Sequence, residues 1–343
     1  MRRVFAIHPS IKGIVDLSKY LGFKSCITEK IIWDSNSPEF IFVSERIYTD
    51  INEWELFKKM YNPQRIFIFV SGECMTPDLN IFDYAIVFDR KLKDLDRICR
   101  IPTNYIRHRS LIKKVNDMSF ENALSRVKEL DFCSFIYSNP KADQIREDVF
   151  WGLMNYKHVD SLGEYLNNSG VKPTRNDKHW RELSIEMKSR YKFSIAVENA
   201  QYEGYISEKL LTSFQSHSVP IYWGDPLVVD EYNPKAFINF NEMSSISELV
   251  NHVKEIDEND ELWAEMVSAD WQTSEQVARV KKETEEYDLF IEHILAQSVS
   301  DAIRRPRGCW PYIYTNRFFD EKWFLKSKAK RYIRKAIHCF EEQ

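Results

Sequence analysis

Cysteines are few in this sequence, and they follow no recognisable spacing. Disulfide-rich secreted domains and zinc modules both use dense, regular cysteine patterns. Here no CxxC pair and no zinc-type spacing occurs, and the six cysteines are scattered along the chain as Cys26, Cys74, Cys99, Cys133, Cys309 and Cys339. We therefore expect reduced thiols, as in a cytosolic protein, and neither a disulfide framework nor a zinc site.

Long apolar runs are also absent. A membrane-spanning helix needs about 20 consecutive apolar residues, and no run approaches that length. The N-terminus carries Arg2 and Arg3, but His8, Pro9 and Lys12 interrupt it too early for a secretory signal peptide. We expect the protein to remain in the cytoplasm.

The chain lacks a surplus of positive charge and lacks glycine-rich motifs. Its formal net charge is −4, so neutralisation of phosphates cannot drive binding, and we predict no nucleic-acid partner. Only nine glycines occur, and the patterns GxGxxG, GxxxxGK[ST], HExxH and GxSxG are missing. Dinucleotide oxidoreductases, P-loop enzymes and the common hydrolases therefore have no motif support.

What the sequence does contain is an alternation of short apolar runs with helical patterns. Phe40–Ser44, Arg65–Val70 and Tyr84–Asp89 have the composition of buried strands, and residues 52–61 have helical spacing. Alternation of this kind predicts an α/β fold, in which helices cover both faces of parallel sheets.

A second alternating block follows a charged stretch at residues 116–128. The strands expected in it are Phe132–Tyr137, His158–Leu162, Phe193–Asn199, Val219–Trp223 and Ala236–Phe240. Two such blocks predict two Rossmann-like domains that face a cleft. We place the first domain at residues 1–128, the second at 129–300, and a basic tail at 301–343.

The stretch from residue 193 to 240 carries the most specific chemistry. A strand ends at Asn199, a loop contains Gly204, and Ser207 then opens a helix as its N-cap, followed by Glu208 and Lys209. A lysine in a first helical turn opposes the helix dipole unless an anion docks there. The alternative is a Glu–Lys pair on a solvated turn.

In order and spacing, this stretch resembles the donor-binding motif of the α-1,3-fucosyltransferases, glycosyltransferase family 10. The family pattern has Glu-Asn, then Gly-Tyr-(Val/Ile)-(Thr/Ser)-Glu-Lys, then Val-Pro-Ile-Tyr-Trp-Gly and Phe-Asn-Pro-x-Ser-Phe-Ile. The corresponding pieces here are Glu198-Asn199, Gly204–Lys209, Val219–Gly224 and residues 232–238, with Tyr232 and Ala236 as departures.

Two upstream segments are similar to the same family. Ser138-Asn139-Pro140 precedes Arg146, the position of the family's diphosphate-binding arginine, and an exposed helix arginine is the alternative. Glu73 follows the strand Arg65–Val70, where the family has its catalytic base, although Val87 replaces a glycine of that pattern. A loop carboxylate without catalytic duty is the alternative for Glu73.

The resemblance implies the two-domain GT-B fold and an inverting transfer of L-fucose from GDP-β-L-fucose to an acceptor oligosaccharide, with α-1,3 linkage to the GlcNAc of a Gal-GlcNAc unit. The first domain would hold the acceptor and the second GDP-fucose. The alternatives are a GT-B enzyme with another nucleotide sugar, and a catalytically dead glycan-binding relic.

The same resemblance assigns roles to individual residues. Glu73 would deprotonate the acceptor, and Glu208 would lie near the ribose or the cationic sugar ring. The donor site would be formed by Arg146, Lys209, Asn199, Tyr205, Gly204 and Ser207. No metal and no cofactor would be required, because two cations and a helix N-terminus already stabilise the diphosphate.

The tail has its own pattern. Residues 321–343 combine a basic face with an aromatic-rich apolar face, as interfacial helices do. We expect this segment to bind an anionic membrane surface and to place the enzyme on the inner membrane face. The alternative is a C-terminal helix that packs on the protein body.

Overall fold

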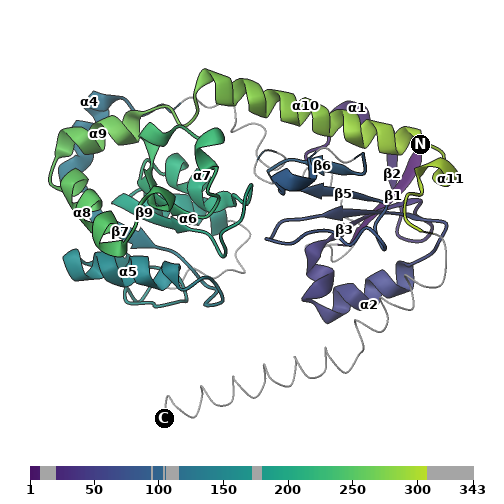
Figure 1. Ribbon diagram of the computed structural model, residues 1–343, viewed down its shortest axis with the longest axis horizontal. Helices are drawn as coiled ribbons and strands as arrows, with labels where there is room; N and C mark the ends of the chain where they lie inside the picture. Colours follow the sequence, from purple (N-terminus) through teal and green to yellow (C-terminus); the bar gives the residue numbers. More distant parts are fainter. Residues whose placement is uncertain (8–20, 94–95, 103–104, 106–115, 172–179, 307–343) are drawn as a thin grey trace, which may run out of the picture.

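The computed structural model describes residues 1–7, 21–93, 96–102, 105, 116–171 and 180–306. These residues form two α/β halves, each built on its own sheet, and one long helix runs from the second half along the first (Figure 1). All strand pairings in both sheets are parallel, which confirms the predicted α/β class with two parallel sheets.

The first sheet has the strand order β2-β1-β3-β4-β5-β6. Its strands are β1 (Arg2–Ile7), β2 (Ile31–Trp33), β3 (Phe40–Ser44), β4 (Ile66–Val70), β5 (Tyr84–Val87) and β6 (Ile98–Arg100). Helices α1 (Ser25–Thr28) and α2 (Ile51–Met60) belong to this half. Asp50 caps α2, since its side chain accepts hydrogen bonds from the amides of Asn52 and Glu53.

Both faces of the first sheet are buried, which explains why its central strands are continuously apolar. Along β3, Phe40 and Phe42 lie in one core cluster, whereas Ile41 and Val43 lie in another. The same period of two holds along β4. Helix α2 contributes Trp54, Phe57 and Met60 to the second cluster.

The second sheet has the order β11-β10-β9-β7-β8. Its strands are β7 (Asp131–Phe135), β8 (Val159–Ser161), β9 (Tyr191–Val197), β10 (Val219–Trp223) and β11 (Ile238–Asn239). The helices of this half are α4 (Phe120–Arg126), α5 (Ile145–Tyr156), α6 (Trp180–Lys188), α7 (Glu208–Gln215), α8 (Ile246–Asp257) and α9 (Asp260–Ser268). Short 3-10 turns occur at Glu45–Tyr48, Arg90–Leu92, Val127–Glu129, Val228–Asp230, Pro234–Ala236 and Phe240–Glu242.

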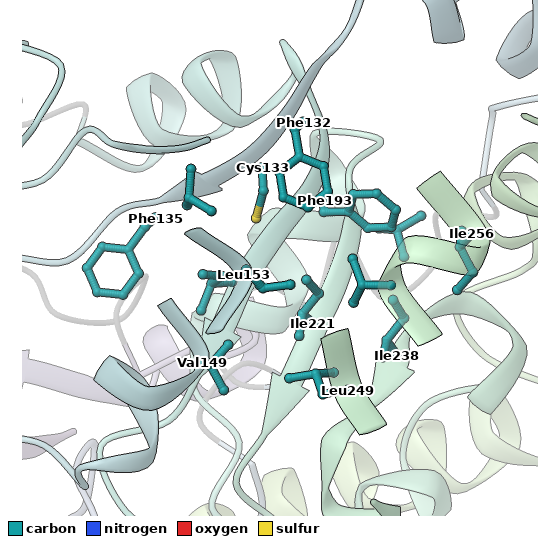
Figure 2. Close-up of a cluster of buried hydrophobic side chains, with 14 of the residues drawn as sticks. Phe132, Cys133, Phe135, Val149, Leu153, Phe193, Ile221, Ile238, Leu249 and Ile256 are labelled. Carbon is teal, nitrogen blue, oxygen red and sulfur yellow. The ribbon is translucent and has the colours of Figure 1, made fainter. Parts of the chain in front are cut away.

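Two apolar clusters cover the faces of the second sheet. In the larger one, Phe193 and Ile221 of the sheet pack with Leu153 of α5 and with Leu249 of α8 (Figure 2). In the smaller one, helix α7 packs on the opposite face through Leu210 and other apolar residues. Because α7 is anchored to its sheet in this way, its N-terminal turn is fixed relative to the end of β9.

Helix α10 (Ser274–Ala296) differs from the predicted domain division. It begins beside the second half but packs along the first sheet, with Tyr287 and Ile291 fully buried in the first core (Figure 1). Helix α11 (Val299–Ala302) adds Ala302 to the same core. Residues 280–302 therefore pack with the first half, whereas we had placed residues 280–300 in the second domain and residues 301–302 in the tail. A helical pattern alone does not reveal which sheet its apolar stripe will cover.

Candidate active site

Glu73 lies in the loop that follows β4, at the carboxyl end of the first sheet. The hydroxyl of Ser71 donates to the carbonyl oxygens of Glu73 at 2.7 Å and Met75 at 3.2 Å. The amide of Gly72 donates to Glu45 Oε2 at 3.0 Å. These bonds fix the loop backbone, while the Glu73 side chain is exposed.

The side chain of Glu73 reaches the second half of the molecule. Its Oε2 accepts hydrogen bonds from Asn199 Nδ2 at 3.3 Å and from the Tyr205 hydroxyl at 3.1 Å. Both donors follow β9, at the carboxyl end of the second sheet. Carboxyl ends of parallel strands are where α/β proteins hold their ligands, and here the two ends meet.

Arg146 stands in the first turn of α5 and is 1% exposed. The alternative prediction, that Arg146 is an exposed arginine on a helix, is therefore wrong. Its guanidinium donates to the carbonyl oxygens of Val197 at 3.2 Å and Asn139 at 3.3 Å, and to Asn199 Oδ1 at 2.6 Å. The guanidinium also stacks over the Tyr137 ring, 4.2 Å from its centre.

The charge of Arg146 is not balanced by a neighbouring carboxylate within the described parts of the chain. Its partners there are neutral oxygens and an aromatic ring, and Nε has no hydrogen-bond partner. A buried cation without a counter-ion is costly unless a ligand supplies the negative charge. This arrangement suits an anion such as a diphosphate.

Lys209 has an internal partner that the sequence did not reveal. Its Nζ lies 2.9 Å from Glu198 Oε2, and Glu198 is fully buried at the end of β9. Burial alone would lower the pKa of Lys209, but Glu198 and Glu208 outweigh it and hold that pKa above its ordinary value. Glu198 therefore supplies part of the negative charge that we expected a bound anion to supply to Lys209.

Ser207 caps helix α7, as the sequence predicted. The same carboxylate of Glu198 accepts from the Ser207 amide and from the Ser207 hydroxyl, both at 2.7 Å. Glu198 thus joins the end of β9, the helix cap and Lys209. Glu208 occupies the first turn of α7 and is half-buried.

A buried lysine of α6, Lys188, contacts helix α7. Its Nζ donates to Thr212 Oγ1 at 2.8 Å and to Ser213 Oγ at 3.1 Å. Burial lowers the pKa of Lys188 to about 7, although Glu208 partly opposes this. Nothing in the sequence separates this lysine from the others of the chain.

Gly204 is where the loop after β9 crosses onto the first half. Its φ is +88°, and a Cβ there would lie 2.4 Å from the carbonyl oxygen of Phe88. Next to it, the Tyr205 ring packs on the Phe88 ring at 5.2 Å, and the Tyr202 hydroxyl donates to Asp89 at 2.9 Å. Glycine is therefore required by the close approach of two backbones, a role distinct from the predicted donor contact.

A buried charge cluster outside the predicted site also joins the two halves. Glu231 accepts from Arg90 and Arg100 at 2.8 Å each, and from the Tyr105 hydroxyl at 2.7 Å. Burial would raise the pKa of Glu231, but Arg100 and then Arg90 outweigh it and lower that pKa. Arg100 also pairs with Glu283 of α10 at 2.9 Å. Sequence reasoning missed this cluster because its members are far apart along the chain.

The described ranges contain neither a metal-binding cluster nor a membrane-spanning helix. No group of three or more histidine, cysteine or acidic residues there is arranged to hold a metal ion. Likewise, no helix in those ranges combines the length and apolar character that crossing a membrane requires. The predicted membrane-binding segment, 321–343, lies outside the described residues.

Comparison with protein families gives two matches. Residues 127–301 match the family described as glycosyltransferase family 10 (fucosyltransferase), C-terminal part. Residues 28–107 match the N-terminal domain of alpha-(1,3)-fucosyltransferase FucT. The second match covers a region in which the sequence offered only the weak pattern around Glu73.

Curated proteins with related sequences include bacterial and animal fucosyltransferases. The Helicobacter pylori alpha-(1,3)-fucosyltransferase FucT is 32% identical over 216 residues, covering 54% of this chain and 43% of that protein. GDP-fucose protein O-fucosyltransferase 3 of Xenopus laevis is 26% identical over 220 residues, covering 63% of this chain and 45% of that protein. The matched segments thus span less than half the length of these relatives.

Among solved structures, an alpha1,3-fucosyltransferase with GDP-fucose superimposes on this chain with a TM-score of 0.65. The match covers 89% of this chain and 92% of the other, at 23% sequence identity. At that identity the likeness shows the fold alone, and the chemistry has to be argued from the residues of this chain.

Proposed function

Because this chain belongs to glycosyltransferase family 10 and has the GT-B fold, we propose that it is an inverting fucosyltransferase that uses GDP-fucose. One observation carries the proposal. Glu73 of the first half lies in hydrogen-bond contact with Asn199, and Asn199 contacts the buried cation Arg146. The side-chain amide of Asn199 therefore links Glu73, a carboxylate able to accept a proton, to Arg146, a cation able to hold a diphosphate.

In the proposed reaction, the acceptor hydroxyl oxygen attacks the anomeric carbon of β-linked fucose as its proton passes to the Glu73 carboxylate. The bond between that carbon and the phosphate oxygen breaks, and GDP departs with the electron pair. A single in-line displacement converts the β-linked donor into an α-linked product. Glu73 is suited to this step because its side chain is exposed at the carboxyl end of the first sheet.

Negative charge grows on the departing diphosphate, and the second half offers three groups that stabilise it. The first is Arg146, whose charge no described carboxylate balances. The others are the N-terminal amides of α7 and the ammonium of Lys209. Since Glu198 already pairs with Lys209, we assign the larger share of diphosphate binding to Arg146. For Glu208 we propose a position near the ribose or the cationic sugar ring of the donor.

For the acceptor, we propose a glycan hydroxyl, with α-1,3 linkage to the GlcNAc of a Gal-GlcNAc unit. The match of residues 28–107 to the N-terminal domain of an alpha-(1,3)-fucosyltransferase supports this choice. That part of the chain carries Glu73, the proposed base for the acceptor hydroxyl. A protein hydroxyl is the second candidate, since relatives of this chain include enzymes named as protein O-fucosyltransferases.

The test is incubation of the purified chain with GDP-fucose and a panel of Gal-GlcNAc oligosaccharides and serine- or threonine-containing peptides, followed by linkage analysis. We expect an α-linked fucose on the GlcNAc, inhibition by GDP, and no inhibition by UDP. Inhibition by UDP with transfer from a UDP-sugar would show another donor. Glycan binding without any transfer would identify a catalytically dead relic.

A further inference from the structure

We propose that Asn199 and Tyr205 are positioning residues for the base Glu73, a role that rests on the proposed function and differs from the nucleotide contacts the sequence suggested. Both residues donate to the same oxygen, Oε2 of Glu73. The other oxygen, Oε1, accepts no hydrogen bond from any described residue. The carboxylate is thus held by one oxygen, and the second is left for the acceptor hydroxyl.

The two donors are themselves fixed, which is what a positioning role requires. Tyr205 is 3% exposed, and its ring packs on Phe88 with centres 5.2 Å apart. Asn199 is held from its other end, because its Oδ1 accepts from Arg146 Nη2 at 2.6 Å. Since Arg146 also binds the backbone of Val197 and Asn139, the Asn199 side chain has little freedom.

Glu73 by itself has the opposite character. Its backbone is tied by Ser71, but its side chain is exposed, and an exposed glutamate ordinarily samples several rotamers. Two hydrogen bonds from rigid partners restrict that sampling at the point where the proton is taken. Catalysis depends steeply on such placement, so losing a bond should lower kcat rather than donor affinity.

The first variant is Tyr205→Phe, which removes one hydroxyl and keeps the ring on Phe88. We expect kcat to fall about ten- to a hundred-fold, the range for a hydrogen bond to a charged group, with the Kd for GDP unchanged. The second is Asn199→Asp, which keeps an acceptor for Arg146 but removes the donor to Glu73. We expect at least as large a fall in kcat.

The decisive readout is a double-mutant cycle with Glu73→Gln, measured by single-turnover transfer from GDP-fucose. If Tyr205 acts through the Glu73 carboxylate, Tyr205→Phe lowers the rate in the wild-type background but not in the Glu73→Gln background. If Tyr205 had only a structural role, the two substitutions would act independently, and the double variant would show the product of the two fold-changes in rate. Tyr202→Phe is the matched control, because Tyr202 also donates across the two halves, to Asp89 at 2.9 Å, but does not contact Glu73. Its kcat should stay at the wild-type value.

Two results would overturn the inference. One is an unchanged kcat in Tyr205→Phe, and the other is a double variant whose rate falls by the product of the two single fold-changes. The rate of Glu73→Gln alone separates a failure of this inference from a failure of the proposed function. If Glu73→Gln itself turns over as fast as the wild type, the base assignment is wrong. If Glu73→Gln loses activity while Tyr205→Phe does not, only the positioning role is wrong.

Discussion

The carboxylate of Glu198 is fully buried and lies 2.9 Å from the ammonium of Lys209. Removing one member of such a pair leaves the other charge uncompensated. We expect Lys209→Ala to lower the free energy of unfolding by about 3–5 kcal/mol, measured by chemical denaturation. The double variant Glu198→Gln with Lys209→Met should recover most of this loss. Wild-type stability of Lys209→Ala would show that the pair is not formed in solution.

Gly204 and Gly170 form a natural comparison, because both have a positive φ but different surroundings. At Gly204 a Cβ would lie 2.4 Å from the Phe88 carbonyl oxygen, whereas at Gly170 nothing lies within 4 Å. We expect Gly170→Ala to cost about 1–2 kcal/mol of stability, the penalty for left-handed backbone alone. Gly204→Ala should cost more and should also lower activity, because the loop that holds Tyr205 must move. Equal losses in thermal unfolding would contradict the close contact between the halves.

Arg146→Ala tests the diphosphate site. Because a charge-assisted hydrogen bond is worth about 1.5–3 kcal/mol, the affinity for GDP should fall about ten- to a hundred-fold in isothermal titration calorimetry. Arg126→Ala is the control. Arg126 is a half-buried arginine of the same half that donates to the Ser189 carbonyl oxygen at 2.6 Å, and it contacts none of the site residues. Unchanged GDP binding in Arg146→Ala would remove Arg146 from the donor site.

For the tail we propose, from its sequence, that residues 321–343 bind anionic membranes and place the enzyme on the inner membrane face. Their basic face should attract the lipid headgroups at about 1 kcal/mol for each basic residue near the surface. Removal of these residues should abolish sedimentation with anionic vesicles and leave activity on a free glycan intact. High salt should weaken vesicle binding by the full chain. Unfolding on truncation, with no vesicle binding by the full chain, would identify the tail as part of the protein body.

Much of the fold follows from local sequence patterns. The continuous apolar runs at β3, β4, β5 and β9 identified buried parallel strands, and Ser207 identified the start of α7. Strands β1, β2 and β6 were missed: β1 begins with two arginines, and β2 and β6 are only three residues long. Periodicity is weak in such short or charged strands, and their assignment depends on the sheet that they join.

The candidate site was predictable only as a set of separate residues. The resemblance singled out Glu73, Arg146 and Lys209, and also Asn199 and Tyr205, but it did not predict that Asn199 and Tyr205 contact Glu73. Glu198 was noticed as part of a motif, and its pairing with Lys209 depends on how β9 and α7 meet. Contacts of Asn199 with Glu73, 126 residues away, arise from the packing of two halves and have no local signature.

The rate of the Glu73→Gln variant shows whether Glu73 is the catalytic base. The substitution keeps the size of the side chain and removes its ability to accept the proton of the acceptor hydroxyl. Single-turnover transfer from GDP-fucose should slow by about 10² to 10⁴-fold, the usual contribution of a general base, with GDP affinity unchanged. Transfer at the wild-type rate would show that Glu73 is not the base.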